Sequence, residues 1–239
     1  MTTADHFELD SLYNKIAGII SIPESRKKYP CVVLSHGLLS SMESSKYLSL
    51  SEDLNKAGVA TCRFDYHGCG KSGGNIEETT LTIRVANLDR VVAYVLNHNF
   101  IDPERIGVLG SSFGGSTCIV KAAKDKRIKC ISLWATPYRL EKKEDEKISD
   151  VEFRESIYSD FLTYDLLSEA KKISHALVTH GELDEVVPCS EGIGIYEQIK
   201  KPKKLEIIKG ADHIFSVMSH REKAINLSLN WFKRYLLNR

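Results

Sequence analysis

The pentapeptide Gly110-Ser111-Ser112-Phe113-Gly114 has the pattern Gly-x-Ser-x-Gly. The apolar residues 106–109 before it predict a short buried strand, and residues 115–123 after it predict a packed helix. A serine at a sharp turn from a strand into a helix is typical of a nucleophile elbow. We expect Gly110 and Gly114 to lie where side chains would clash as strand and helix close on each other. Ser112 would then hold a strained backbone conformation with its hydroxyl exposed.

Strand-like and helix-like segments alternate along the rest of the chain. After two short N-terminal strands (7–10 and 15–20), the sequence predicts strands at 31–35, 59–64, 130–134, 176–181 and 204–208, and helices at 43–57, 80–98, 190–199 and 227–236. This alternation predicts right-handed crossovers and an α/β fold with a mostly parallel central sheet flanked by helices. Asp102-Pro103 predicts a turn before the strand that leads into the elbow.

The alternation breaks between residues 138 and 174. This segment begins with a run dense in both charges, residues 141–147, which predicts a solvated surface. We interpret 138–174 as a small helical cap insertion within a single domain that spans residues 1–239. Because its aromatic residues fall between two strands whose ends face the elbow, we expect the insertion to form one wall of a binding pocket, with Phe153, Tyr158 and Phe161 close to Ser112. The strand end at 134–137 is a second candidate for the lining.

The composition argues against several classes of partner. The chain has 33 Lys and Arg against 32 Asp and Glu, a formal net charge of +1, so we expect no nucleic-acid partner. No apolar run is long enough to cross a bilayer, and residues 1–6 lack the order of a signal peptide. We therefore expect a cytoplasmic protein with no membrane partner. The six cysteines include no Cys-x-x-Cys pair, which predicts reduced thiols, and no side chains have the spacing of a metal site.

A serine hydroxyl needs a base to accept its proton, and that base needs a carboxylate to orient it. Asp184 lies in the loop after the strand 176–181, and His213 lies in the loop after the last strand, 204–208. In a doubly wound sheet, loops after parallel strands gather along one edge. Ser112, Asp184 and His213 are therefore predicted to meet there.

Other side chains compete for these roles. Glu182, Glu185 and Asp212 are the rival carboxylates, and His36, His67 and His180 are the rival histidines. We interpret His36 as shaping a loop, His67 as structural and His180 as a core histidine. The glycine-rich segment 65–74 follows a strand, but it lacks the spacing of a phosphate-binding loop, so we interpret it as a tight turn.

The order Ser, Asp, His along the chain identifies a resemblance to the α/β-hydrolase family. Five blocks carry it: Leu34-Ser35-His36-Gly37, residues 64–72, Gly110-Ser111-Ser112-Phe113-Gly114-Gly115, Gly181-Glu182-Leu183-Asp184 and Gly210-Ala211-Asp212-His213. Within this family, the chain looks most like small intracellular carboxylesterases of the cinnamoyl/feruloyl esterase type. It also resembles the catalytic domains of prolyl-oligopeptidase-like serine peptidases.

The resemblance implies a role for each residue. Ser112 is expected to attack a carbonyl carbon, His213 to accept and return the proton, and Asp184 to orient His213. The backbone N–H groups of Leu38 and Phe113 are expected to form the oxyanion hole. The implied activity is hydrolysis of small carboxylic esters through an acyl-enzyme, with no cofactor and no metal.

Several alternatives to an esterase stay open. An aminopeptidase or a thioesterase of the same fold would use the same three residues. The 239 residues leave no room for the N-terminal propeller of prolyl oligopeptidases, which favours an esterase. A non-catalytic binding protein of this fold is a further alternative, which the presence of Ser112, Asp184 and His213 disfavours. The oligomeric state stays open, with a homodimer as one option.

Overall fold

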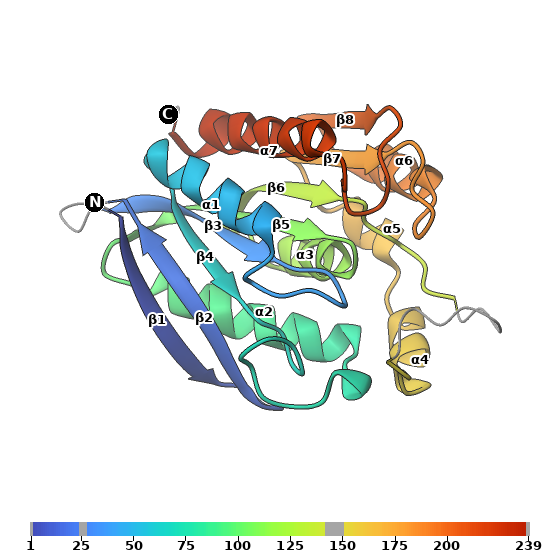
Figure 1. Ribbon diagram of the computed structural model, residues 1–239, viewed down its shortest axis with the longest axis horizontal. Coiled ribbons are helices and arrows are strands. Elements are labelled where there is room, and N and C mark those ends of the chain that lie inside the picture. Colours follow the sequence, from blue (N-terminus) through green and yellow to red (C-terminus); the bar gives the residue numbers. More distant parts are fainter. Residues whose placement is uncertain (1, 24–27, 142–150, 238–239) are drawn as a thin grey trace.

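The computed structural model describes residues 2–23, 28–141 and 151–237 (Figure 1). Its centre is an eight-stranded sheet with the strand order β1-β2-β4-β3-β5-β6-β7-β8. The strands are β1 (Thr3–Asp10), β2 (Lys15–Ile22), β3 (Tyr29–Ser35), β4 (Ala60–Phe64), β5 (Ile101–Ser111), β6 (Ile128–Trp134), β7 (Ala176–Gly181) and β8 (Lys203–Ile208). All residues of β3 are buried, as expected for an apolar strand in the middle of a parallel sheet.

Most of the sheet is parallel. The ladders from β4 through β3, β5, β6 and β7 to β8 are parallel, whereas β2 pairs antiparallel with both β1 and β4. Strand β3 lies between β4 and β5, so the chain leaves it first toward one edge and later continues toward the other. Ligands of such sheets bind outside the carboxyl ends of the strands at this reversal of order. The loops after β3 and β5 are therefore the expected place for a site.

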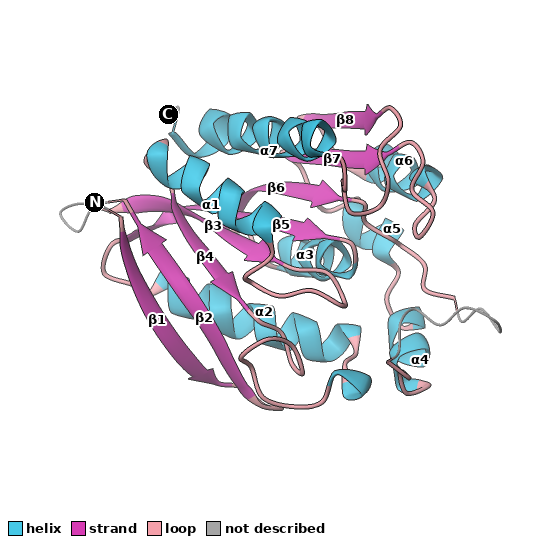
Figure 2. Cartoon of the chain, in the orientation of Figure 1, coloured by secondary structure: helices cyan, strands magenta, loops and turns pink. Residues whose placement is uncertain are grey.

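Helices cover both faces of the sheet (Figure 2). They are α1 (Ser45–Lys56), α2 (Leu81–Leu96), α3 (Phe113–Lys124), α4 (Ser156–Leu162), α5 (Leu166–Ala170), α6 (Cys189–Gln198) and α7 (Met218–Phe232), with a short η1 (Ile76–Glu78) and a final π-helical turn η2 (Lys233–Leu237). Helices α1 and α7 enclose one hydrophobic core with the sheet, and α2 to α6 enclose the other. No helix in the described ranges has the length and apolarity needed to span a membrane.

The predicted elements are present, but α7 begins at Met218, well before the predicted 227, and one predicted turn is absent. The turn predicted at Asp102-Pro103 is wrong, because β5 already begins at Ile101. The pairing of β5 with β3 shifts between Ile101 and Ile106, so the intervening residues form a bulge inside the strand. Proline has no N–H to donate to the ladder, and the Asp102 Oδ1 accepts from the Glu104 N–H at 2.9 Å, so this dipeptide suits a bulge as well as a turn.

The break in the alternation contains two short helices. Helix α4 packs against α2, and α5 packs between α3 and α6 as part of the connection from β6 to β7. Most of the charged run predicted to be a solvated surface, residues 142–147, lies outside the described residues. All six cysteines are free thiols, and only Cys189 is partly exposed.

Candidate active site

The predicted elbow is present at the end of β5. Ser112 has φ 54° and ψ −129°, a conformation that costs a non-glycine residue about 1–3 kcal/mol. A Cβ atom on Gly110 would lie 2.4 Å from the Gly114 oxygen, and one on Gly114 would lie 2.4 Å from the His36 oxygen. The two glycines therefore allow strand β5, helix α3 and the loop after β3 to meet around Ser112.

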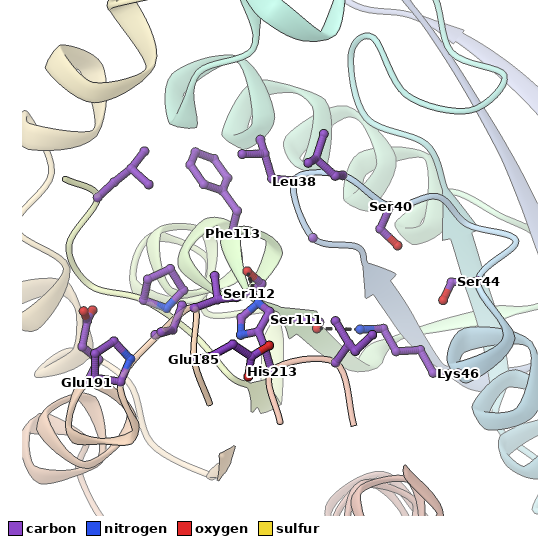
Figure 3. Close-up of a pocket in the computed structure, with 18 of the residues that line it drawn as sticks. Leu38, Ser40, Ser44, Lys46, Ser111, Ser112, Phe113, Glu185, Glu191 and His213 are labelled. Carbon is purple, nitrogen blue, oxygen red and sulfur yellow. Dashed lines mark hydrogen bonds between the residues drawn. The ribbon is translucent and has the colours of Figure 1, made fainter. Parts of the chain in front are cut away.

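The structure brings Ser112, His213 and Asp184 into one hydrogen-bonded chain. The Nε2 atom of His213 lies 3.0 Å from Ser112 Oγ, and its Nδ1 atom lies 2.8 Å from Asp184 Oδ2. Ionised Asp184 can only accept, so the His213 Nδ1 carries the proton and Nε2 is free to accept from the Ser112 hydroxyl. Figure 3 shows Ser112 and His213 side by side below Phe113.

The Asp184 carboxylate is surrounded by donors. Its Oδ1 accepts from the backbone N–H groups of Val186 (3.0 Å) and Val187 (2.7 Å), and His180 Nε2 lies 3.1 Å from its Oδ2. Burial on its own raises the pKa of Asp184, but the hydrogen bonds from His180, His213 and Val187 outweigh burial and hold the pKa well below its usual range. Asp184 is thus a fixed anion beneath His213.

His180 therefore has a role that the sequence did not reveal. It is a buried histidine, as predicted, yet its Nε2 donates to Asp184 and also to the Val187 oxygen at 2.9 Å. Two of the rival carboxylates accept hydrogen bonds from backbone N–H groups of the loops. Glu182 accepts from the Gly210 N–H at 2.9 Å and Asp212 accepts from the Ser216 N–H at 2.8 Å. The third rival, Glu185, lines the pocket described below.

His36 and His67 lie away from this chain. The Tyr66 N–H donates to His36 Nε2 at 3.1 Å, so the proton lies on Nδ1, which donates to the Gly37 oxygen at 2.7 Å. Burial, together with the charge of Arg84, keeps the pKa of His36 well below its usual range, so the ring is neutral. The His67 N–H donates to Asn87 Oδ1 at 2.9 Å within the glycine-rich segment.

The glycine-rich segment ties two loops together. Asp65 Oδ1 accepts from the Met42 N–H at 2.7 Å in the loop after β3, and Asp65 Oδ2 accepts from the Lys71 N–H at 2.9 Å. A Cβ on Gly70 would lie 2.1 Å from Asp65 Oδ2, so only glycine fits this turn. These contacts agree with the interpretation of the segment as a tight turn.

A buried arginine holds the loop after β3. Arg84 of α2 is fully buried and donates to the oxygens of His36 (3.1 Å), Gly37 (3.0 Å) and Leu38 (3.4 Å). In a planar trans peptide the N–H points opposite to the C=O. Since the Gly37 oxygen faces Arg84, the Leu38 N–H faces away from it. Arg84 thereby sets the orientation of one predicted oxyanion donor.

The second predicted donor is the N–H of Phe113. Phe113 is the first residue of α3, and the first N–H groups of a helix have no acceptor within it. Its ring packs against Phe161, with 5.5 Å between the two ring centres, and against Arg84, whose Cζ atom lies 5.3 Å from the Phe113 ring centre. Leu38 and Phe113 both line the pocket that contains Ser112.

This pocket has a volume of about 810 Å³ and opens over Ser112 and His213. The segment after β6 contributes Pro137, Arg139, Leu140 and Glu141 to its lining. The beginning of the predicted insertion 138–174 therefore lines the pocket, whereas its aromatic residues Phe153, Tyr158 and Phe161 do not, contrary to the prediction. Phe161 is instead buried against Phe113, because an aromatic ring gains more from the core than from an open pocket.

The strand end at 134–137, the second candidate for the lining, also lies partly in the pocket and partly in the core. Only Pro137 reaches the pocket, whereas Trp134, Ala135 and Thr136 are fully buried. The Trp134 Nε1 donates to Ser228 Oγ at 2.9 Å, which fixes α7 to the sheet. Within the described residues, no three potential ligand side chains gather in a way that could hold a metal ion.

Comparison with known proteins decides the family. The sequence pattern of the prolyl oligopeptidase family matches residues 50–239. The chain belongs to this family. The family match covers the elbow and the loops that carry Asp184 and His213, whereas the loop with Leu38 lies before it.

Several proteins are similar to this family member. An uncharacterized 31.7 kDa protein of Escherichia coli, from the traX-finO intergenic region, is 31% identical over 131 residues, which are 55% of this chain and 44% of that protein. The chain thus spans less than half of the length of this curated relative. The structure of the alpha/beta hydrolase GrgF from Penicillium sp. sh18 has a TM-score of 0.81 at 18% identity and covers 98% of this chain and 99% of that one.

A third likeness is to Est1E of Butyrivibrio proteoclasticus, whose structure was solved with ferulic acid bound. It has a TM-score of 0.81 at 24% identity and covers 94% of this chain and 98% of that one. These likenesses show that the protein has the α/β-hydrolase fold. They agree with the fold predicted from the five sequence blocks.

Proposed function

We propose that this protein is a serine hydrolase that cleaves small carboxylic esters through an acyl-enzyme. The observation that carries the proposal is the chain of hydrogen bonds from Ser112 through His213 to Asp184, with distances of 3.0 and 2.8 Å, at the base of a pocket. A serine, a neutral imidazole and a fixed carboxylate in this order form the arrangement that activates a hydroxyl for attack.

The proposed reaction begins with attack of Ser112 Oγ on the ester carbonyl carbon. The hydroxyl proton moves to His213 Nε2, and Asp184 stabilises the resulting imidazolium through its bond to Nδ1–H. As the tetrahedral intermediate collapses, His213 gives this proton to the leaving alkoxide, and the acyl group stays on Ser112. Water then attacks the acyl-enzyme with His213 as base, and the carboxylic acid leaves.

The oxyanion of the intermediate would be bound by two N–H groups. Leu38 is held with its N–H directed away from Arg84, and Phe113 offers its N–H at the start of α3. The neighbouring buried guanidinium of Arg84 adds a positive potential behind this loop. Loss of one donor of such a pair in other enzymes costs about 3–4 kcal/mol in the barrier, so both donors are important for the rate.

Two observations favour esters as the substrates. Leu38, Phe113 and Val187 give the pocket apolar surface beside Ser112, and Est1E, which has the same fold, was solved with ferulic acid bound. Family membership favours a second candidate, cleavage of peptide or aminoacyl amide bonds by the same three residues.

Labelling by a fluorophosphonate probe tests the proposed nucleophile. We expect a single adduct that maps to Ser112 in the digested wild-type protein and no adduct in Ser112→Ala. Hydrolysis of 4-nitrophenyl esters should vanish in the same variant while its circular dichroism stays unchanged. Turnover that persists in a clean Ser112→Ala preparation would disprove the proposal. Comparing 4-nitrophenyl esters with aminoacyl 4-nitroanilides separates the two candidate functions.

A further inference from the structure

Two cations line the side of the pocket next to α1. Lys46 is the second residue of α1, and Arg221 lies in the first turn of α7. The Lys46 ammonium donates to Ser111 Oγ at 3.0 Å, and Arg221 Nη1 donates to Ser45 Oγ at 3.2 Å. Among the described residues, neither cation has a carboxylate oxygen within 4.0 Å, the limit for an ion pair. Within the described ranges, both positive charges therefore lack a neutralising partner.

The surroundings of these cations favour an anion. Hydroxyl groups line this side of the pocket, from Ser40, Ser44, Ser45 and Ser111. Helix α1 begins here without an acidic residue in its first turn, so its N-terminus adds a partial positive charge. Placing a lysine at this helix end is electrostatically unfavourable unless a negative group is bound nearby.

Three acidic residues also line the pocket, but among the described residues none of them forms an ion pair with Lys46 or Arg221. Glu191 accepts from the N–H groups of Tyr138 (2.8 Å) and Arg139 (3.2 Å), and Figure 3 shows it on the opposite side of Ser112 from Lys46. Glu141 and Glu185 line the pocket with exposed side chains. Burial and the charge of Arg221 lower the pKa of Lys46 to about 8, as expected for a cation without a counter-charge.

We propose that Lys46 and Arg221 form a subsite for a carboxylate carried by the substrate, so that this protein prefers acidic esters. The inference rests on the proposed function, because it places the carboxylate beside the carbonyl that Ser112 attacks. Lys46 contacts Ser111, the residue directly before the proposed nucleophile, so the carboxylate lies a few bonds from the scissile carbonyl. It can belong to the acyl part or to the alcohol part of the ester.

Matched pairs of esters test the subsite and distinguish these two sources. For the acyl side, 4-nitrophenyl hydrogen adipate is compared with 4-nitrophenyl hexanoate, and for the alcohol side 4-acetoxybenzoate is compared with 4-methylphenyl acetate. We expect the wild type to prefer the acidic member of one pair through a lower KM. In Lys46→Met the ratio of kcat/KM for acidic over neutral ester should fall about tenfold, the effect of losing one charge-assisted contact.

Two further variants sharpen the comparison. Lys46→Arg keeps the charge and should retain most of the preference. Lys56→Met removes a lysine at the other end of α1, where it pairs with Glu52 on the exposed surface, and should leave the ratio unchanged. If Lys46→Met slows acidic and neutral esters equally, Lys46 only supports Ser111 and the proposal is wrong. The absence of any preference for acidic esters in the wild type also overturns it.

A binding experiment separates this proposal from the proposed function. In Ser112→Ala, calorimetric titration with the acidic and the neutral member of the pair that the wild type discriminates measures the subsite without turnover. Binding of the acidic ester that is lost in the Ser112→Ala, Lys46→Met double variant supports the subsite. Equal affinity for both esters contradicts the subsite, whereas residual hydrolysis by Ser112→Ala contradicts only the proposed nucleophile.

Discussion

Asp184 accepts hydrogen bonds from two histidines and two backbone N–H groups, so its replacement tests how far His213 depends on it. In Asp184→Asn we expect kcat for a 4-nitrophenyl ester to fall by about 10⁴-fold, because an amide favours the wrong tautomer of His213. Asp212→Asn is the matched control, since Asp212 lies next to His213 in sequence but accepts from the Ser216 N–H. An equal loss in both variants would contradict the assignment of Asp184 as the orienting residue.

The same carboxylate makes stability depend on pH. Because the folded protein holds the pKa of Asp184 below its unfolded value of about 3.9, its ionised form stabilises the fold above that pH. This contribution is lost as the pH falls below the unfolded value, since protonation then favours the unfolded chain. We expect the difference in Tm between wild type and Asp184→Asn to shrink between pH 6 and pH 3. A constant difference across this range would mean that Asp184 keeps an ordinary pKa.

At the scale of elements, α2 positions the loop after β3 through Arg84. Replacing Arg84 with Met leaves three backbone oxygens without their donor, so the Leu38 N–H loses its orientation. We expect kcat to fall by up to about 100-fold, the cost of a misplacement near 1 Å, with a smaller change in KM. Arg90→Met is the control on the same helix, because Arg90 is exposed and donates to the Asp10 oxygen at the sheet edge. Equal kinetics of the two variants would show that Arg84 does not position the loop.

Local patterns predicted the elements and the three residues that meet, because these depend on chain order and on where parallel strands end. Ser112, Asp184 and His213 follow β5, β7 and β8, so the sheet itself brings them together. The role of Arg84 in holding the loop after β3 was not predicted, although its position in the sequence indicates a buried side chain. Arg84 occupies the apolar face of α2, three residues after Leu81 and four before Leu88, where a charged residue needs buried partners.

The pocket lining could not be predicted, because it depends on contacts between distant segments. Phe161 was predicted to line the pocket, but its contact with the Phe113 ring, which the sequence does not show, places it in the core. His180 and Lys46 likewise gain their roles from partners that the sequence does not place beside them, Asp184 and Ser111. Composition and periodicity describe which residues are buried, but not which of them face one another.

At the scale of the whole molecule, the family match leaves out β3 and the loop after it, which borders the pocket. The match begins at residue 50, inside α1, yet β3 lies in the middle of the sheet between β4 and β5, and the loop after it contains Leu38. A chain that begins at residue 50 would lack this buried strand and Leu38, one of the two proposed oxyanion donors. Its loss would also leave β4 and β5 without their common neighbour in the sheet.

We therefore expect a chain of residues 50–239 to be unfolded or aggregated and to hydrolyse no ester. A chain that begins at residue 12 is the matched control, because it lacks only the edge strand β1, in which Phe7 is the one buried residue. That chain should keep its turnover with a lower Tm, since the Phe7 ring covers Gly18 of β2. Circular dichroism, size-exclusion chromatography and ester turnover compare the two chains. A folded, active 50–239 chain would show that β3 and Leu38 are dispensable, and with them the proposed oxyanion hole.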